Sequence, residues 1–226
     1  WALCEFPHDW VFDYVEQLDG LPEKVMEESD EVVLVGFSMG GSMTVRMLES
    51  FPGFFAAAFP MCPAYAASEA EIKLFSAVPV WLTVSKYDVL AGYYTYSEKL
   101  WNGICQQTEC PEDCRLSLLG KVTFPDGTKT QSNHHVWFAI SNDLFQYNGS
   151  AYANMKTENA NGEEISLEYP NGLISWLNQF TSSYDGAQMQ PNPIPEQTVL
   201  TTLGMAGRMI VAIFRMFRET LKSLFY

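Results

Sequence analysis

The sequence has 226 residues, of which 47% are hydrophobic and 14% aromatic, a globular composition with room for one core-forming domain, with or without an appendage. The formal net charge of −14 argues against a nucleic-acid partner, because phosphate binding requires clustered Lys and Arg side chains. No apolar run is long enough to span a bilayer.

The N-terminal part opens with a helical pattern. Apolar residues recur at helical spacing over 9–28, with Asp9 as an N-cap candidate and a break near Gly20 and Pro22. The chain begins at Trp1, without an initiator Met or a signal-peptide pattern. We therefore expect a processed chain or a fragment.

The middle of the chain alternates apolar runs with amphipathic stretches. The runs predict buried strands at 31–37, 54–61, 78–85 and 115–124. The stretches between them predict helices at 38–50, 68–76 and 91–107. Strands that alternate with helices indicate an α/β fold, with a mostly parallel sheet flanked by helices.

Weaker signals follow the last predicted strand. The pattern predicts a turn at 125–127, a helix at 135–145, a short strand and turn at 163–172, and a helix at 173–180. We therefore expect one domain over residues 1–180.

The composition changes after residue 180. Residues 181–199 are polar and rich in Pro and Gly, and predict a linker. Residues 200–226 predict an amphipathic helix with four basic residues opposite its apolar face, and the whole tail has one acidic residue, Glu219. Its apolar face needs a partner surface, and we weigh packing on this chain, self-association and peripheral membrane contact.

The chain has five cysteines, three of them close together as Cys105, Cys110 and Cys114. One local disulfide in an oxidising compartment and reduced thiols are both open interpretations. No Cys-x-x-Cys pair occurs, and His134 and His135 lie about twenty residues further on, which is poor zinc spacing. We expect neither a metal nor a cofactor.

The most informative motif is Gly36-Phe37-Ser38-Met39-Gly40, between a predicted strand and a predicted helix. This Gly-x-Ser-x-Gly pattern is typical of a nucleophile elbow, a strained turn that lifts the serine hydroxyl above the sheet. Small residues two positions before and after the serine allow that turn. The pattern predicts Ser38 as a nucleophile and the Met39 backbone N–H as an oxyanion-hole donor.

A nucleophilic serine requires a base and an acid that orients the base. Asp88 comes just after the predicted strand 78–85, at the end of a parallel sheet where ligand chemistry gathers. His134 and His135 follow the last predicted strand. We expect one of these histidines to be the base and the other to line the pocket, with a helix-cap aspartate as the alternative role of Asp88.

The stretches "LVGFSMGG", "VPVWLTVSKYD" and "NHHVW" resemble, in order and context, the nucleophile, acid and base of the α/β-hydrolase superfamily. Within it, the sequence is similar to bacterial feruloyl- and acetyl-xylan-type esterases and to prolyl-oligopeptidase-like hydrolases. The resemblance covers about residues 9–180. In those esterases the base commonly lies in His-x-x-Trp, which matches His134 and Trp137 and favours His134.

The resemblance implies a serine carboxylester hydrolase acting on a small-molecule ester, with plant cell-wall esters as one source. It also implies a secreted or cell-envelope protein of a bacterium. A peptidase or amidase with the same triad and a non-catalytic binding module are the alternatives. Only 37 residues precede Ser38, whereas such hydrolases carry several strands there and take the second oxyanion donor from a loop among them. We expect an absent N-terminal piece or a partner to supply both.

Overall fold

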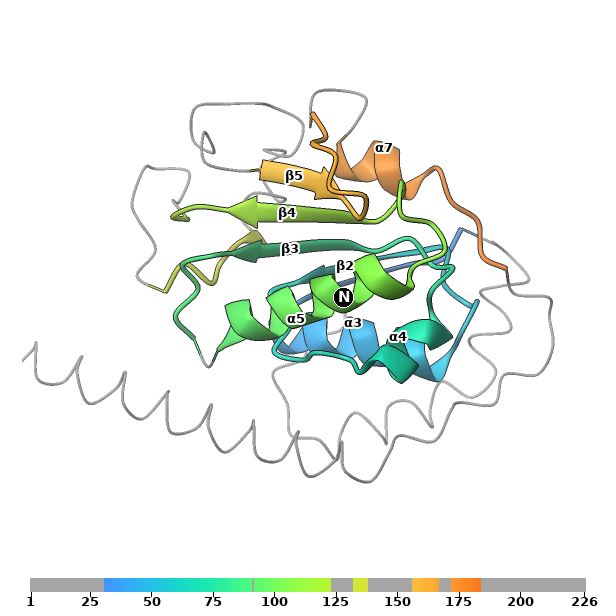
Figure 1. Ribbon diagram of the computed structural model, residues 1–226, viewed down its shortest axis with the longest axis horizontal. Helices are drawn as coiled ribbons and strands as arrows, with labels where there is room; N and C mark the ends of the chain where they lie inside the picture. The colour runs from blue at the N-terminus through green and yellow to red at the C-terminus, as the bar shows by residue number, and fades with distance from the viewer. Residues whose placement is uncertain (1–30, 91, 123–131, 138–155, 167–171, 184–226) are drawn as a thin grey trace, which may run out of the picture.

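The computed structural model describes residues 31–90, 92–122, 132–137, 156–166 and 172–183, which form a five-stranded sheet with helices packed on it (Figure 1). The strands lie in the order β1-β2-β3-β4-β5; β1 to β4 are parallel, and β5 is antiparallel to β4. Their bounds are Val33–Phe37, Ala57–Met61, Trp81–Ser85, Arg115–Leu119 and Lys156–Asn159. The predicted α/β fold with a mostly parallel sheet is therefore confirmed.

Helices cover both faces of this sheet. Their bounds are α3 Met39–Ser50, α4 Glu69–Leu74, α5 Tyr93–Gln107 and α7 Leu173–Leu177. Helices α3, α4 and α5 lie on one face (Figure 1). Helix α7 packs on the other face, where the Trp176 and Trp81 ring centroids are 5.4 Å apart. All four helices lie within the predicted helical stretches.

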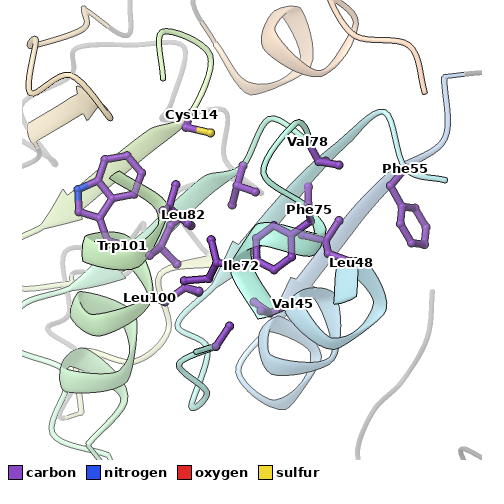
Figure 2. Close-up of a cluster of buried hydrophobic side chains, with 14 of the residues drawn as sticks. Val45, Leu48, Phe55, Ile72, Phe75, Val78, Leu82, Leu100, Trp101 and Cys114 are labelled. Atoms are coloured by element: carbon purple, nitrogen blue, oxygen red, sulfur yellow. The ribbon is translucent and has the colours of Figure 1, made fainter. Parts of the chain in front are cut away.

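The core has two layers because successive strand residues point to opposite faces. Ala58, Val80 and Leu82 face α3, α4 and α5, in the cluster that Figure 2 draws. Their neighbours Ala57 and Trp81 belong to the second cluster, with Trp176 of α7. Strands β2 and β3 are fully buried, which explains their continuous apolar runs.

Two strands differ from the prediction. We expected burial on both faces for 31–37, but β1 is only partly buried and Val35 is 48% exposed. It is an edge strand of the described sheet, so its second edge lacks the cover that β2 has. The strand predicted at 115–124 ends at Leu119, and the Gly120 carbonyl accepts a hydrogen bond from Ser85 instead of extending the ladder.

Strand β5, Lys156–Asn159, was not predicted. We expected a strand within 163–172; of the described residues 163–166, Glu164 forms an isolated bridge back to Glu158, and residues 167–171 lie outside the described ones. The buried residues of β5 are Thr157 and Asn159, not apolar ones. A 2.7 Å hydrogen bond between the Ser117 and Thr157 hydroxyls stabilises the pair, so hydrophobic alternation gave no signal.

Several predicted segments lie outside the described residues. They are the helix at 9–28, the turn at 125–127, most of the helix at 135–145, most of the linker at 181–199 and the helix at 200–226. Among the described helices, none has the length and apolarity to cross a membrane.

A buried charged cluster joins α3 to α4. Arg46 Nη1 lies 2.9 Å from Glu49 Oε2 and 3.4 Å from Glu71 Oε1. The guanidinium also lies over the Tyr65 ring, 3.7 Å from its centroid. Burial raises the pKa of Glu49 to about 7, against the opposing charge of Arg46. Between about pH 4.5 and pH 7, the folded chain therefore favours the protonated Glu49 carboxyl, whereas the unfolded chain favours the carboxylate.

We expect Glu49→Gln to remove part of the pH dependence of stability. The unfolded carboxyl ionises near pH 4.5 and the folded one near pH 7. Below pH 4.5 the carboxyl is protonated in both states, so Glu49 does not lower the free energy of unfolding there. Its destabilising contribution grows between those values, to at most about 3 kcal/mol, and is then constant. Urea unfolding from about pH 4 to pH 8 should show the variant gaining stability relative to the parent across this interval.

The matched control is Glu69→Gln, which changes an exposed carboxyl on α4. Because the Glu69 side chain is exposed, this change should alter the free energy of unfolding by no more than about 0.5 kcal/mol. If Glu49→Gln runs parallel to the parent, Glu49 does not carry this proton.

Candidate active site

Ser38 occupies a strained turn between β1 and α3. Its backbone has φ 59° and ψ −116°, a conformation that residues with a Cβ rarely adopt. The turn is held from both sides, because the Ser38 N–H donates to the Met61 carbonyl of β2 and the Ser38 carbonyl accepts from the Ser42 N–H. This geometry presents the half-buried hydroxyl at the carboxyl end of β1.

Glycine is required at two positions around this turn. A Cβ at Gly36 would lie 2.2 Å from the Gly40 carbonyl oxygen, and one at Gly41 would lie 2.4 Å from the Met61 carbonyl oxygen. At Gly40 a Cβ would meet nothing within 4 Å. The steric requirement thus falls on Gly36 and Gly41, whereas the motif places it on Gly36 and Gly40.

Asp88 follows β3 and is fixed at the same end of the sheet. Its side chain is fully buried. Oδ1 accepts a 3.0 Å hydrogen bond from the Leu90 N–H, and the Asp88 N–H donates to the Ser85 carbonyl. The carboxylate therefore has one oxygen held by its own loop and the other directed to a different segment.

His134 lies between Asp88 and Ser38. Its Nδ1 is 2.6 Å from Asp88 Oδ2, and its Nε2 is 2.9 Å from Ser38 Oγ. The structure thus brings together three residues that are 46 and 96 positions apart in the chain. With Nδ1–H donating to the carboxylate, Nε2 is the basic nitrogen and can accept the serine proton.

The His134 ring is held by two aromatic neighbours. Ring centroids are 4.9 Å apart for Phe37 and 4.5 Å for Tyr93. The Tyr93 hydroxyl oxygen also lies 3.4 Å from Ser38 Oγ. Burial raises the pKa of Tyr93, with a smaller contribution from the Asp88 charge, so its hydroxyl keeps its proton. Sequence reasoning missed Tyr93, whose proximity depends on the start of α5.

His135, the alternative base, does not occupy this position. Its ring centroid is 6.2 Å from that of His134 and 6.4 Å from that of Phe37. Burial and the neighbouring His134 lower the pKa of His135. The hydrogen bonds to Asp88 and Ser38 come from His134, and the His135 ring packs beside the site.

Cys62, which the sequence did not single out, completes the buried side of the site. It directly follows β2, its Sγ donates to the His134 carbonyl at 3.6 Å, and its N–H donates to the Thr83 carbonyl. Burial and then the Asp88 charge raise the pKa of the Cys62 thiol. A position just after a parallel strand was the available sequence signal.

Three residues of this site, Cys62, Asp88 and His134, are of types that can bind a metal ion. Donor atoms of Cys62, Asp88 and His134 all lie within 4.8 Å of one another. Asp88 and His134 already share a short hydrogen bond, and the Cys62 thiol is held in its protonated form. We therefore assign no cation to this cluster.

Backbone strain concentrates at this site. The non-glycine residues with positive φ in the described ranges are Ser38, Cys62 and Asn133, at 59°, 45° and 54°. Asn133 precedes His134, and its side-chain oxygen accepts from the Val122 N–H. Each strained residue either supplies or directly supports a polar group of the cluster. Such strain is typical of functional sites.

The expected oxyanion donor lies at the start of α3. Met39 is the first residue of that helix, where backbone N–H groups have no intrahelical acceptor and the helix dipole favours negative charge. Its side chain is 40% exposed, which places this end of the site at the surface. We assign no second donor among the described residues.

Comparison with known proteins adds little. No family model matches the chain, and no curated protein matches it. Among solved structures it is similar to a thermostable esterase, with 19% identity and a TM-score of 0.44. The match covers 66% of this chain and 30% of that esterase. A score at this level does not establish a common fold, so function has to be argued from the site.

Proposed function

We propose that the chain is the catalytic part of a serine hydrolase that cleaves carboxylic esters through an acyl-serine intermediate. The observation that carries the proposal is the chain of contacts from Ser38 Oγ to His134 Nε2 at 2.9 Å and from His134 Nδ1 to Asp88 Oδ2 at 2.6 Å. Both distances are within the range for a nucleophile, a base and an orienting acid.

In this mechanism Ser38 Oγ attacks the ester carbonyl carbon and His134 Nε2 takes its proton. Asp88 stabilises the imidazolium that forms, and the Met39 N–H donates to the oxyanion. His134 then protonates the departing alcohol, leaving an acyl group on Ser38. A water molecule, deprotonated by His134, attacks the acyl carbon and releases the acid.

Exposed hydrophobic side chains flank the proposed nucleophile and acid in the sequence. They are Met39, Tyr87 and Val89, at 40%, 43% and 72% exposure, and the Lys86 and Lys121 ammonium groups lie 5.2 and 5.9 Å from the Tyr87 ring centroid. The three hydrophobic residues are adjacent in sequence to Ser38 and Asp88. Exposed apolar and aromatic side chains beside these residues suit the acyl or aryl groups of small-molecule esters, including plant cell-wall esters.

The test compares substrate classes on one preparation. We expect turnover of p-nitrophenyl acyl esters and methyl ferulate, weak or no turnover of peptide p-nitroanilides, and labelling of Ser38 by a fluorophosphonate. Amide turnover that exceeds ester turnover would assign the site to a peptidase or amidase. A chain that neither turns over esters nor takes the label would be a binding module.

A further inference from the structure

A pair of thiols lies at the opposite end of the sheet from Ser38. Cys114 immediately precedes β4, at the amino end of that strand, whereas Ser38 and Asp88 follow the carboxyl ends of β1 and β3. Cys110 and Cys114 are joined by one turn, since the Cys114 N–H donates to the Cys110 carbonyl. This i to i+4 bond directs both side chains to one side.

The two sulfur atoms lie 3.9 Å apart. Cys110 is half-buried, and Cys114 is 1% exposed, at the border of the core cluster that Figure 2 shows. A disulfide requires about 2.05 Å between sulfurs, so small side-chain rotations would close the gap. We propose that Cys110 and Cys114 are a peroxide-oxidisable dithiol, in which Cys110 attacks the oxidant and Cys114 resolves the product to a disulfide.

The polar surroundings distinguish the two thiols. The Thr108 hydroxyl oxygen lies 3.5 Å from Cys110 Sγ and 3.3 Å from Cys114 Sγ. The Thr108 hydroxyl donates to the Ser76 carbonyl at 3.2 Å. Hydrogen bonding from the Cys114 thiol is the largest cause that lowers the pKa of Cys110, to about 7, and burial and the charges of Asp113 and Glu109 oppose it. The same shared proton, together with burial, raises the pKa of Cys114. Cys110 is thus the more acidic and the more accessible thiol of the pair, and Cys114 is placed to donate a hydrogen bond to its thiolate form.

The chemistry has two steps. The Cys110 thiolate attacks one oxygen of hydrogen peroxide, which forms a sulfenic acid and releases hydroxide. The Cys114 sulfur then attacks the Cys110 sulfur, a disulfide forms, and the hydroxyl group leaves as water with the thiol proton. The sulfurs lose two electrons, the peroxide gains them, and an external thiol reverses the change.

The loop between the two cysteines connects several elements. The Pro111 carbonyl accepts from the Ala160 N–H after β5, and the Asp113 carbonyl accepts a 3.0 Å hydrogen bond from the Trp176 indole of α7. The Glu109 N–H donates to the Ser76 carbonyl after α4. These bonds hold the turn in the reduced chain, so the two sulfur atoms already lie near each other before oxidation.

Cys105 is the matched control within the same chain. It is more exposed than Cys110, but burial and the charge of Glu158 raise the pKa of Cys105. Accessibility therefore predicts faster alkylation of Cys105, and thiolate character predicts faster alkylation of Cys110.

The first experiment alkylates the full-length reduced chain with iodoacetamide and quantifies each cysteine by mass spectrometry. We expect Cys110 to react about tenfold faster than Cys105 at neutral pH, with a midpoint near pH 7. Equal rates, or faster reaction at Cys105, would overturn the assignment of Cys110 as the attacking thiol.

The second experiment treats the chain with hydrogen peroxide. We expect the two fragments produced by cleavage after Glu112 to remain joined until dithiothreitol is added. In Cys114→Ala, dimedone should trap Cys110 as a sulfenic acid, and the joined fragments should be lost in both Cys114→Ala and Cys110→Ala. Cys110 remaining a free thiol in the parent after peroxide treatment would refute the proposal. None of these measurements depends on ester turnover.

Discussion

Ser38→Ala is expected to lower kcat/KM for ester substrates by about 10⁴-fold or more while leaving the fold intact. The hydroxyl is the only group lost, and its described partners are the His134 Nε2 at 2.9 Å and the Tyr93 hydroxyl at 3.4 Å. Alanine keeps the Cβ and therefore the same backbone preference. Steady-state kinetics with an acyl ester, together with fluorophosphonate labelling, measures the loss.

Ser38→Gly separates the chemistry from the backbone strain. It removes the same hydroxyl, but glycine accepts the observed φ of 59° without the penalty of about 1–3 kcal/mol that a residue with a Cβ incurs. We expect both variants to be equally inactive and Ser38→Gly to be at least as stable as the parent in urea. Ester turnover by either variant at a rate comparable to the parent would remove Ser38 from the mechanism.

The sequence predicted the strands whose buried side chains are apolar. Strands β2 and β3 are buried at every residue, so their apolar runs are unbroken. Strand β5 was missed because its buried residues are polar and paired with polar partners, Thr157 with Ser117 among them. Hydrophobic periodicity cannot detect a strand whose buried side chains pair by hydrogen bonds.

The residues of the candidate site also fall into those that the sequence predicted and those that it did not. Ser38, Asp88 and His134 were predicted because each directly follows an expected strand or lies in a recognisable order. The supporting residues Cys62 and Asn133 were not, because their contribution comes from positive φ and from contacts with distant segments. Cys62 also directly follows an expected strand, but that position does not reveal its backbone strain, and such conformations persist only where surrounding structure fixes them.

The sequence also left the base open between two adjacent histidines, which a matched pair of substitutions can resolve. We expect His134→Ala to lower kcat for ester substrates by about 10⁴-fold, since it removes the nitrogen 2.9 Å from Ser38 Oγ and the partner of Asp88. His135→Ala should retain kcat within about tenfold, with a changed KM, because His134 already occupies the position of the base and the His135 ring packs beside it.

Added imidazole distinguishes a lost base from a damaged fold. In His134→Ala the vacated space between Ser38 and the buried Asp88 carboxylate can accept an imidazole in the same orientation. Imidazole should therefore restore part of the ester turnover of His134→Ala and leave His135→Ala unchanged. If His135→Ala is inactive and recovers with imidazole while His134→Ala remains active, His135 is the base. In that case the 2.9 Å contact between His134 Nε2 and Ser38 Oγ would not be the one through which Ser38 loses its proton.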